Sequence, residues 1–136
     1  MQMKNITTAT PVLALMLLIV AGCQKRPDIH FYNASGESVV ILSQQASHVL
    51  NDKGDARFLA PPTMTVGITS GASTNTFVFP YIPRSHITGG LAGIGRPEIR
   101  VQISEDRTLL VLPNGVNFPI NHTNAPVNVF RIGPGK

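Results

Sequence analysis

The 136-residue chain is predicted to fold as an all-β domain, a small antiparallel β-sandwich, with a small β-barrel as the alternative. Three observations predict this fold class. Apolar residues recur at every second position along about nine or ten short runs, as in strands that bury one face. Turn-forming residues separate these runs, and the chain is rich in them, with 12 glycines and 11 prolines in all. Apolar residues make up 43% of the chain and charged residues only 13%, which suits a packed core.

The expected strands follow one another along residues 28–136. They are the runs 28–33, 38–42, 47–50, 55–59, 63–69, 76–81, 98–104, 108–112, 116–120 and 127–132. In the first run, Ile29 and Phe31 face one side of the sheet while His30 and Tyr32 face the other. A turn over residues 33–37 then leads into the second run.

The third and fourth runs flank the sequence Asn-Asp-Lys-Gly at residues 51–54, which favours a hairpin turn. A short helix over residues 43–50, with Ser43 as its N-cap, is the competing interpretation. The apolar residues of that segment fit a helical period poorly, so strands are the stronger prediction.

Four later runs each place three apolar residues on one face. These are Met64, Val66 and Ile68; Phe77, Phe79 and Tyr81; Ile99, Val101 and Ile103; and Val116, Phe118 and Ile120. Pro80 has no N–H to donate to a neighbouring strand, so the run that contains it is expected at the edge of a sheet. The runs 108–112 and 127–132 complete the domain.

The segment 83–97 is the longest stretch without a convincing strand. Loops of this length in compact domains commonly carry function. Arg84, His86 and Arg96 bracket its glycine-rich centre, and Tyr81 precedes it. These four residues are the predicted contact residues for a partner, because Arg and Tyr are favoured in interfaces. The alternative is a mobile surface loop without function.

The sequence contains no recognisable catalytic, cofactor or metal motif. The four histidines are far apart, and none has a carboxylate at metal-ligand spacing. The seven carboxylates fall mostly at predicted turns or strand ends. The glycine-rich residues 89–95 match neither nucleotide-binding pattern. Since the eleven basic residues are scattered, nucleic acid is not an expected partner either. We therefore expect no enzymatic activity, no cofactor and no metal.

The first residues of the chain form a different kind of segment. A short start containing Lys4 precedes an apolar run over residues 12–22, which is the pattern of a secretory signal peptide. This run is too short for a membrane span, which needs about 20 apolar residues. It ends at Cys23, the only cysteine of the chain.

The residues Val20-Ala21-Gly22-Cys23 resemble the lipobox of bacterial lipoproteins. This resemblance covers only the first 23 residues. It implies that residues 1–22 are cleaved off and that Cys23 is lipidated, with further acylation, as by palmitate, of the new N-terminus. Residues 23–27 would then be a short tether and residues 28–136 a single β-domain. A secretory signal with a chance cysteine is the alternative.

Lipidation at Cys23 would place the protein in the bacterial cell envelope, attached to a membrane and facing the periplasm. By resemblance to enteric lipoproteins, Gln24 favours the outer membrane, whereas Lys25 would favour the inner membrane under the sorting rule of some other bacteria. The expected function is a non-catalytic binding or accessory role toward an envelope protein. The alternatives are an inhibitor or immunity lipoprotein against a wall-degrading enzyme or toxin, and a peptidoglycan hydrolase that uses paired carboxylates.

Overall fold

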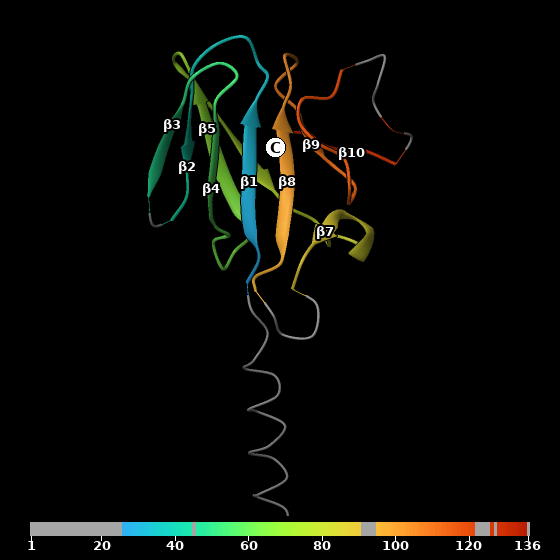
Figure 1. Ribbon diagram of the computed structural model, residues 1–136. Coiled ribbons are helices and arrows are strands. Elements are labelled where there is room, and N and C mark those ends of the chain that lie inside the picture. The colour runs from blue at the N-terminus through green and yellow to red at the C-terminus, as the bar shows by residue number, and fades with distance from the viewer. Residues whose placement is uncertain (1–25, 45, 91–94, 122–125, 127, 136) are drawn as a thin grey trace, which may run out of the picture.

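The computed structural model describes residues 26–44, 46–90, 95–121, 126 and 128–135 (Figure 1). Within them the chain forms ten strands and one 3₁₀ segment. These are β1 (Asp28–Asn33), β2 (Val39–Leu42), β3 (Ser47–Leu50), β4 (Asp55–Leu59), β5 (Thr65–Ser70), β6 (Ser73–Val78), η2 (Arg84–His86), β7 (Ile87–Thr88), β8 (Glu98–Ile103), β9 (Leu109–Val111) and β10 (Phe130–Ile132).

The predicted signal peptide and Cys23 lie outside the described residues. Among the residues that are described, no helix is long and apolar enough to cross a membrane.

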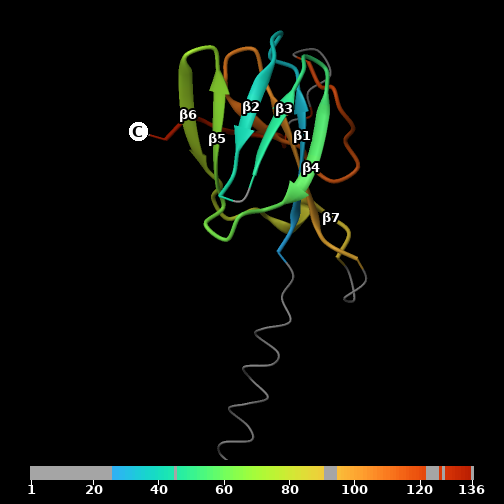
Figure 2. The same ribbon diagram turned by 90° about the vertical axis from the view of Figure 1, so that its left-hand side faces the viewer.

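The strands form two sheets that pack face to face, and Figure 2 shows one of them, made of β2, β3, β5 and β6, turned toward the viewer. Sheet A has the strand order β10-β9-β8-β1-β4, with β7 also paired to β8, and sheet B has the order β3-β2-β5-β6. Neither sheet closes on itself, so the predicted sandwich is confirmed and the barrel alternative is not. One pairing differs from the all-antiparallel prediction, because β1 and β8 run parallel. The chain returns to sheet A at β8 from the same end at which β1 begins.

The core lies between the sheets and uses the alternating positions that the sequence predicted. Ile29 and Phe31 of β1 are fully buried, while His30 and Tyr32 lie on the outer face of sheet A. The same alternation buries Val66 and Ile68, Phe77 and Phe79, and Ile99, Val101 and Ile103. Since full burial of one such side chain contributes about 1.5–3 kcal/mol, the apolar positions decide which face of each strand turns inward.

A second apolar cluster covers the part of the outer face of sheet A around β9. It consists of buried Leu110, Leu112 and Ile120 with the partly buried Val116, Phe118 and Val129. The strand predicted over residues 116–120 is wrong, because this segment forms no strand and instead contacts the side chains of β8 and β1. The Gln102 side chain replaces a strand neighbour: its Nε2 donates to the Ile120 carbonyl and its Oε1 accepts from the Ile120 N–H, both at 2.8 Å.

The hairpin predicted around residues 51–54 is wrong in its pairing, although its turn is present. The Gly54 N–H donates to the Asn51 carbonyl at 2.8 Å, and Lys53 has a φ of 64°. However, β3 pairs with β2 in sheet B, and β4 pairs with β1 in sheet A. The turn therefore carries the chain from one sheet to the other.

The competing helix over residues 43–50 is also wrong. Its second half is the extended strand β3, and Ser43 acts in a turn rather than as a helix cap. The Ser43 N–H and hydroxyl both donate to the Ala46 carbonyl, at 2.9 and 3.2 Å. This arrangement connects β2 to β3 as antiparallel neighbours.

Asn33, the last residue of β1, holds the corner between the sheets. It is fully buried, yet every polar atom of its amide has partners. Its Nδ2 donates to the carbonyl oxygens of Leu50 and Asn51 at 3.1 and 3.2 Å, and to that of Glu37 at 2.7 Å. Its Oδ1 accepts from the N–H and hydroxyl of Ser35 at 3.0 and 2.6 Å.

Replacing Asn33 with alanine is therefore expected to lower the free energy of unfolding by about 1–3 kcal/mol, since buried carbonyls lose their donor. Urea denaturation followed by circular dichroism measures this change. Asn51→Ala is the matched control, because the Asn51 side chain is exposed and accepts a bond from Ser38. It should shift stability by no more than about 0.5 kcal/mol. Equal shifts for both variants would show that Asn33 does not hold the corner.

Candidate functional site

The two ends of the sandwich carry different segments. At one end of the sandwich, β1 and β8 begin and β4 and β6 end (Figure 1). At the opposite end, β1 and β8 end and β4 and β6 begin. We call the first the tether end; among the described residues it includes 26–28, 43–44, 60–64, 79–90, 95–98 and 112–114. The far end comprises residues 34–38, 51–54, 71–72 and 104–108. The described residues of the predicted binding segment, 83–90 and 95–97, thus lie at the same end as Arg26, the first described residue.

Tyr81 does not share the core face with Phe77 and Phe79, contrary to prediction. It is 88% exposed, whereas the two phenylalanines are 1% and 5% exposed. Strand β6 ends at Val78, and the alternation extends only as far as Phe79, whose N–H donates to the Met64 carbonyl at 2.8 Å. The edge position predicted from Pro80 is confirmed, because β6 is the last strand of sheet B. Tyr81 is consequently open to contact.

The segment 83–97 is more regular than predicted. Arg84–His86 forms the 3₁₀ turn, and Ile87 pairs with Ile99 of β8. Its residues 91–94 lie outside the described residues. Arg84 and Arg96 are exposed, and Arg96 Nη1 lies 3.6 Å from Asp28 Oδ1.

His86 differs from the other three predicted contact residues because it is only 6% exposed. Its Nε2 lies 2.7 Å from the carbonyl oxygen of Asn128, and its Nδ1 lies 2.8 Å from the Ser85 hydroxyl. Its ring packs against Phe130 at a centroid distance of 4.9 Å. His86 therefore joins the segment to the C-terminal strand and offers little surface to a partner.

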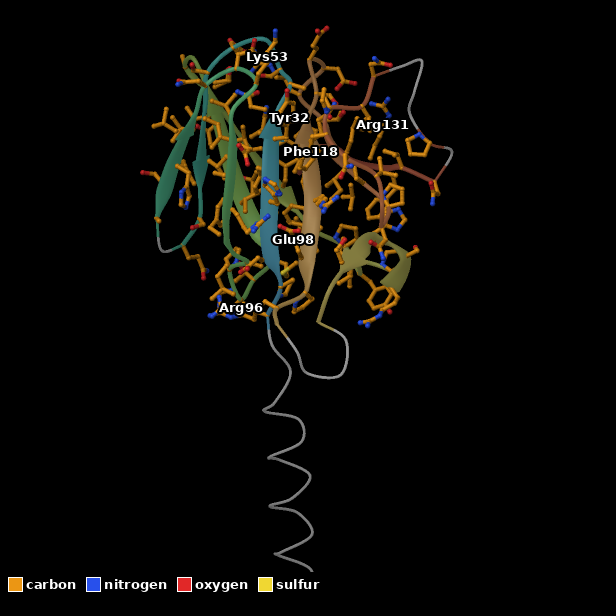
Figure 3. All side chains as sticks on the ribbon, in the orientation of Figure 1. Tyr32, Lys53, Arg96, Glu98, Phe118 and Arg131 are labelled. Carbon is orange, nitrogen blue, oxygen red and sulfur yellow. The ribbon has the colours of Figure 1, made fainter. Side chains whose placement is uncertain are left out.

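Charged residues gather on the outer face of sheet A, where β1 lies between β8 and β4 (Figure 3). We call His30, Asp55, Arg57, Glu98 and Arg100 the charged cluster. Cross-strand register brings them together, since His30 lies opposite both Arg57 and Arg100. His30 Nε2 is 2.7 Å from Asp55 Oδ2, and Arg57 Nε is 2.6 Å from Glu98 Oε1.

Glu98 is the centre of this cluster. Its Oε1 also lies 3.5 Å from His30 Nδ1, and its Oε2 lies 3.6 Å from Arg100 Nε. Although Arg57 is close, Oε1 is buried and receives no aligned hydrogen bond, so that contact is an ion pair without directional bonding. Phe118 closes one side, edge-on to His30 at 5.2 Å and stacked on Tyr32 at 5.3 Å between ring centroids.

A cleft of about 430 Å³ adjoins the charged cluster. It is lined by Asp28, Arg57, Thr88, Gly89, Arg96 and Glu98. Its two carboxylates face arginines, since Asp28 lies beside Arg96 and Glu98 beside Arg57. With opposite charges paired in this way, the cleft has no excess of either sign to attract an ion.

His30 is held in place by other members of the charged cluster and by one aromatic ring. Among the described residues, its side-chain contacts are Asp55, Arg57, Glu98 and the Phe118 ring. None of these is a hydroxyl or thiol nucleophile that a histidine could activate. Cross-strand ion pairs on a sheet surface contribute roughly 0.2–1 kcal/mol each, so the cluster is best explained as a stabilising feature of sheet A.

The other cleft, of about 380 Å³, opens near the far end and involves Asp106 and Arg131. The Thr108 hydroxyl donates to Asp106 Oδ1 at 2.6 Å. This hydrogen bond, aided by the positive charge of Arg131, holds the pKa of the Asp106 carboxyl below its usual value. These contacts fix the 104–108 turn. No group of His, Cys, Asp and Glu in the described part of the chain could hold a metal ion.

The outer face of sheet B has the opposite character, and we call it the uncharged face. Strands β2, β3, β5 and β6 contain no Asp, Glu, Lys or Arg, and their single ionisable residue, His48, stacks on Phe58 at 4.4 Å. The register aligns the outward side chains into rows across the sheet. They are Val40, Leu42, Ser47, Val49, Thr65, Gly67, Thr69, Thr74, Thr76 and Val78.

Large apolar side chains on the uncharged face are open to solvent. Val49 is 70% exposed, Val78 57% and Leu42 39%. Leu42 lies across Gly67, where a Cβ atom would be 3.5 Å from that of Leu42, so the middle of the face stays flat. No single stretch of the sequence indicated this surface. Four separate strands lack charged residues at their alternate positions. This pattern indicates a surface only when those strands are known to be neighbours in one sheet.

Comparisons of the chain with protein-family models, with curated proteins and with solved structures found no match. The function is therefore inferred from the surfaces described above.

Proposed function

We propose that this chain is a lipid-anchored envelope protein whose β-sandwich binds another protein through its uncharged face and has no catalytic activity. The anchor is inferred from the lipobox-like residues 20–23. The observation that carries the binding role is the uncharged face itself, on which Val49 and Val78 are exposed without a covering segment among the described residues.

The distribution of charge supports a protein as the partner. The strands of sheet A carry Asp28, Asp55, Arg57, Glu98, Arg100 and Arg131, whereas those of sheet B carry none of these residue types. Protein interfaces are depleted of charge at their centre, and exposed apolar patches mark interaction sites. A folded envelope protein with a matching apolar surface is therefore the proposed occupant.

The proposed location is the periplasmic face of the outer membrane, because Gln24 follows the lipidated cysteine. Retention in the inner membrane through Lys25 is the alternative. In either membrane the lipid on Cys23 supplies the attachment, since two or three acyl chains anchor much more firmly than one.

The two other functions considered for this chain have less support. An inhibitor or immunity protein would present a projecting loop, but the described far-end turns are short and hydrogen-bonded, as in Arg107 N–H to Ser104 carbonyl at 3.0 Å. A peptidoglycan hydrolase would need two carboxylates with separate roles. Those that line the cleft beside the charged cluster, Asp28 and Glu98, are paired with arginines.

A Val49→Lys/Val78→Lys variant is expected to lose partner binding, because two charges would be desolvated at the contact. Binding is measured by chemical cross-linking in intact cells followed by capture of the protein from solubilised envelopes. The cross-linked band found with the wild type should fall at least about tenfold, the effect of roughly 1.4 kcal/mol. Stability should change little, since both sites are exposed.

Glu105→Lys is the matched control, because it changes the net charge by the same two units at an exposed far-end position. This variant should keep the cross-linked band. Retention of the band by the double variant would overturn the assignment of the uncharged face. A wild type that cross-links to no protein would overturn the binding role.

A further inference from the structure

We propose that the tether end of the sandwich rests on an anionic bilayer surface, with Tyr81 at the membrane interface and Arg26, Arg84 and Arg96 at the level of the lipid headgroups. This inference rests on the proposed lipidation of Cys23. It adds a second contact with the membrane and a fixed orientation of the domain.

The short tether would place this end of the domain near the membrane. Cys23 is separated from Arg26, the first described residue, by Gln24 and Lys25. Three residue steps of extended chain reach about 10 Å. A lipid on Cys23 would therefore hold the tether end close to the headgroups, and the far end would point toward the periplasm.

Exposed side chains at the tether end suit such a surface. Tyr81, at 88% exposed, combines an aromatic ring with a polar tip, as do the tyrosines that gather at membrane interfaces. The described residues provide no acidic partner for Arg84 or Arg26; Arg26 donates to the Ala60 carbonyl at 3.3 Å. Arg96 is 57% exposed and only loosely paired with Asp28, at 3.6 Å.

The tether end carries Arg26, Arg84 and Arg96 against Asp28 and Glu98, and the far end has the opposite charge balance. Its turns contain the carboxylates of Glu37, Asp52, Glu105 and Asp106 against the cations of Lys53 and Arg107. An anionic membrane surface attracts basic residues within a Debye length and repels acidic ones. The charge distribution and the tether therefore favour the same orientation.

This orientation leaves the uncharged face accessible. The strands of sheet B run between the tether end and the far end, so their outer face would stand upright on the membrane (Figure 2). The residues predicted from the sequence to bind a protein, Tyr81, Arg84 and Arg96, would instead contact lipid.

The test uses the full-length, processed protein, purified from membranes and reconstituted into vesicles. Because the chain contains no tryptophan, Tyr81→Trp introduces a single fluorescent indole. Vesicles contain phosphatidylcholine brominated near the headgroup end of its acyl chains, with or without phosphatidylglycerol. The indole at position 81 should be quenched at least about twofold and its emission shifted to the blue, as expected at a membrane interface. Ala72→Trp, at the far end, is the control and should not be quenched.

A further variant tests whether the positive charges of Arg84 and Arg96 contribute to the contact with the membrane. Adding Arg84→Glu and Arg96→Glu to Tyr81→Trp should reduce quenching in vesicles with phosphatidylglycerol and have a smaller effect in vesicles without it. Co-flotation with the vesicles reports the anchor separately. A chain that does not float refutes lipidation, whereas a floating chain whose indole at position 81 remains unquenched refutes this inference alone. Quenching that appears equally at position 72 would also refute the fixed orientation.

Discussion

A Cys23→Ser variant is expected to incorporate no labelled palmitate in cells, whereas the wild type should be strongly labelled. Lipid transfer to a lipobox requires the thiolate sulfur as nucleophile, and a hydroxyl is a far weaker one at neutral pH. Cys23 is the only cysteine of the chain, so its loss removes every thiol that could accept the lipid. Metabolic labelling followed by gel analysis measures the result.

A displaced cysteine provides the control for this experiment. The double variant Cys23→Ser/Ser47→Cys restores one thiol at an exposed position of β3. This double variant should remain unlabelled, because lipid transfer requires a cysteine directly after the apolar run and not merely a thiol somewhere in the chain. Label that persists in Cys23→Ser would overturn the lipobox interpretation. In sucrose gradients the wild type should follow outer-membrane markers, and recovery with inner-membrane markers would mean that Lys25 governs sorting.

Phe31→Ala is expected to lower the free energy of unfolding by about 3–5 kcal/mol, the usual cost of deleting a buried phenylalanine. Phe31 is fully buried in the middle of β1, beside Val101 of the parallel strand β8. Its ring stacks on Phe58 at 5.5 Å and meets Phe79 edge-on at 6.4 Å between centroids. Since small domains are stable by about 5–15 kcal/mol, this loss could unfold the domain near body temperature.

Tyr81→Ala is the matched control for that experiment, because it removes an aromatic ring that is 88% exposed. Its free energy of unfolding should differ from the wild type by no more than about 0.5 kcal/mol. Chemical denaturation of both variants measures the two changes. Similar losses for the two rings would mean that the core has been placed on the wrong face of β1.

The alternation of apolar residues correctly predicted that Phe77 and Phe79 are buried but failed for Tyr81, the third residue of the same pattern. The alternation that buries Phe77 and Phe79 depends on an extended backbone with neighbours on the ladder. The ladder of β6 ends at Val78, so nothing extends the period to position 81. Asn51–Gly54 is a similar case: local residues predict the turn correctly, but the partners of the flanking strands are set by contacts elsewhere.

The sequence by itself determined the fold class and the inward faces of β1, β5 and β8, and its lipobox-like residues 20–23 are the basis of the proposed location. These are local properties, because a strand turns alternate residues to opposite sides and a lipobox is a short contiguous motif. Only the tertiary structure decided the parallel pairing of β1 with β8, the burial of His86 and the charge-free face of sheet B. Each of these depends on which distant segments become neighbours. That choice is made by the summed packing of many side chains across the whole core, which no single stretch of sequence contains.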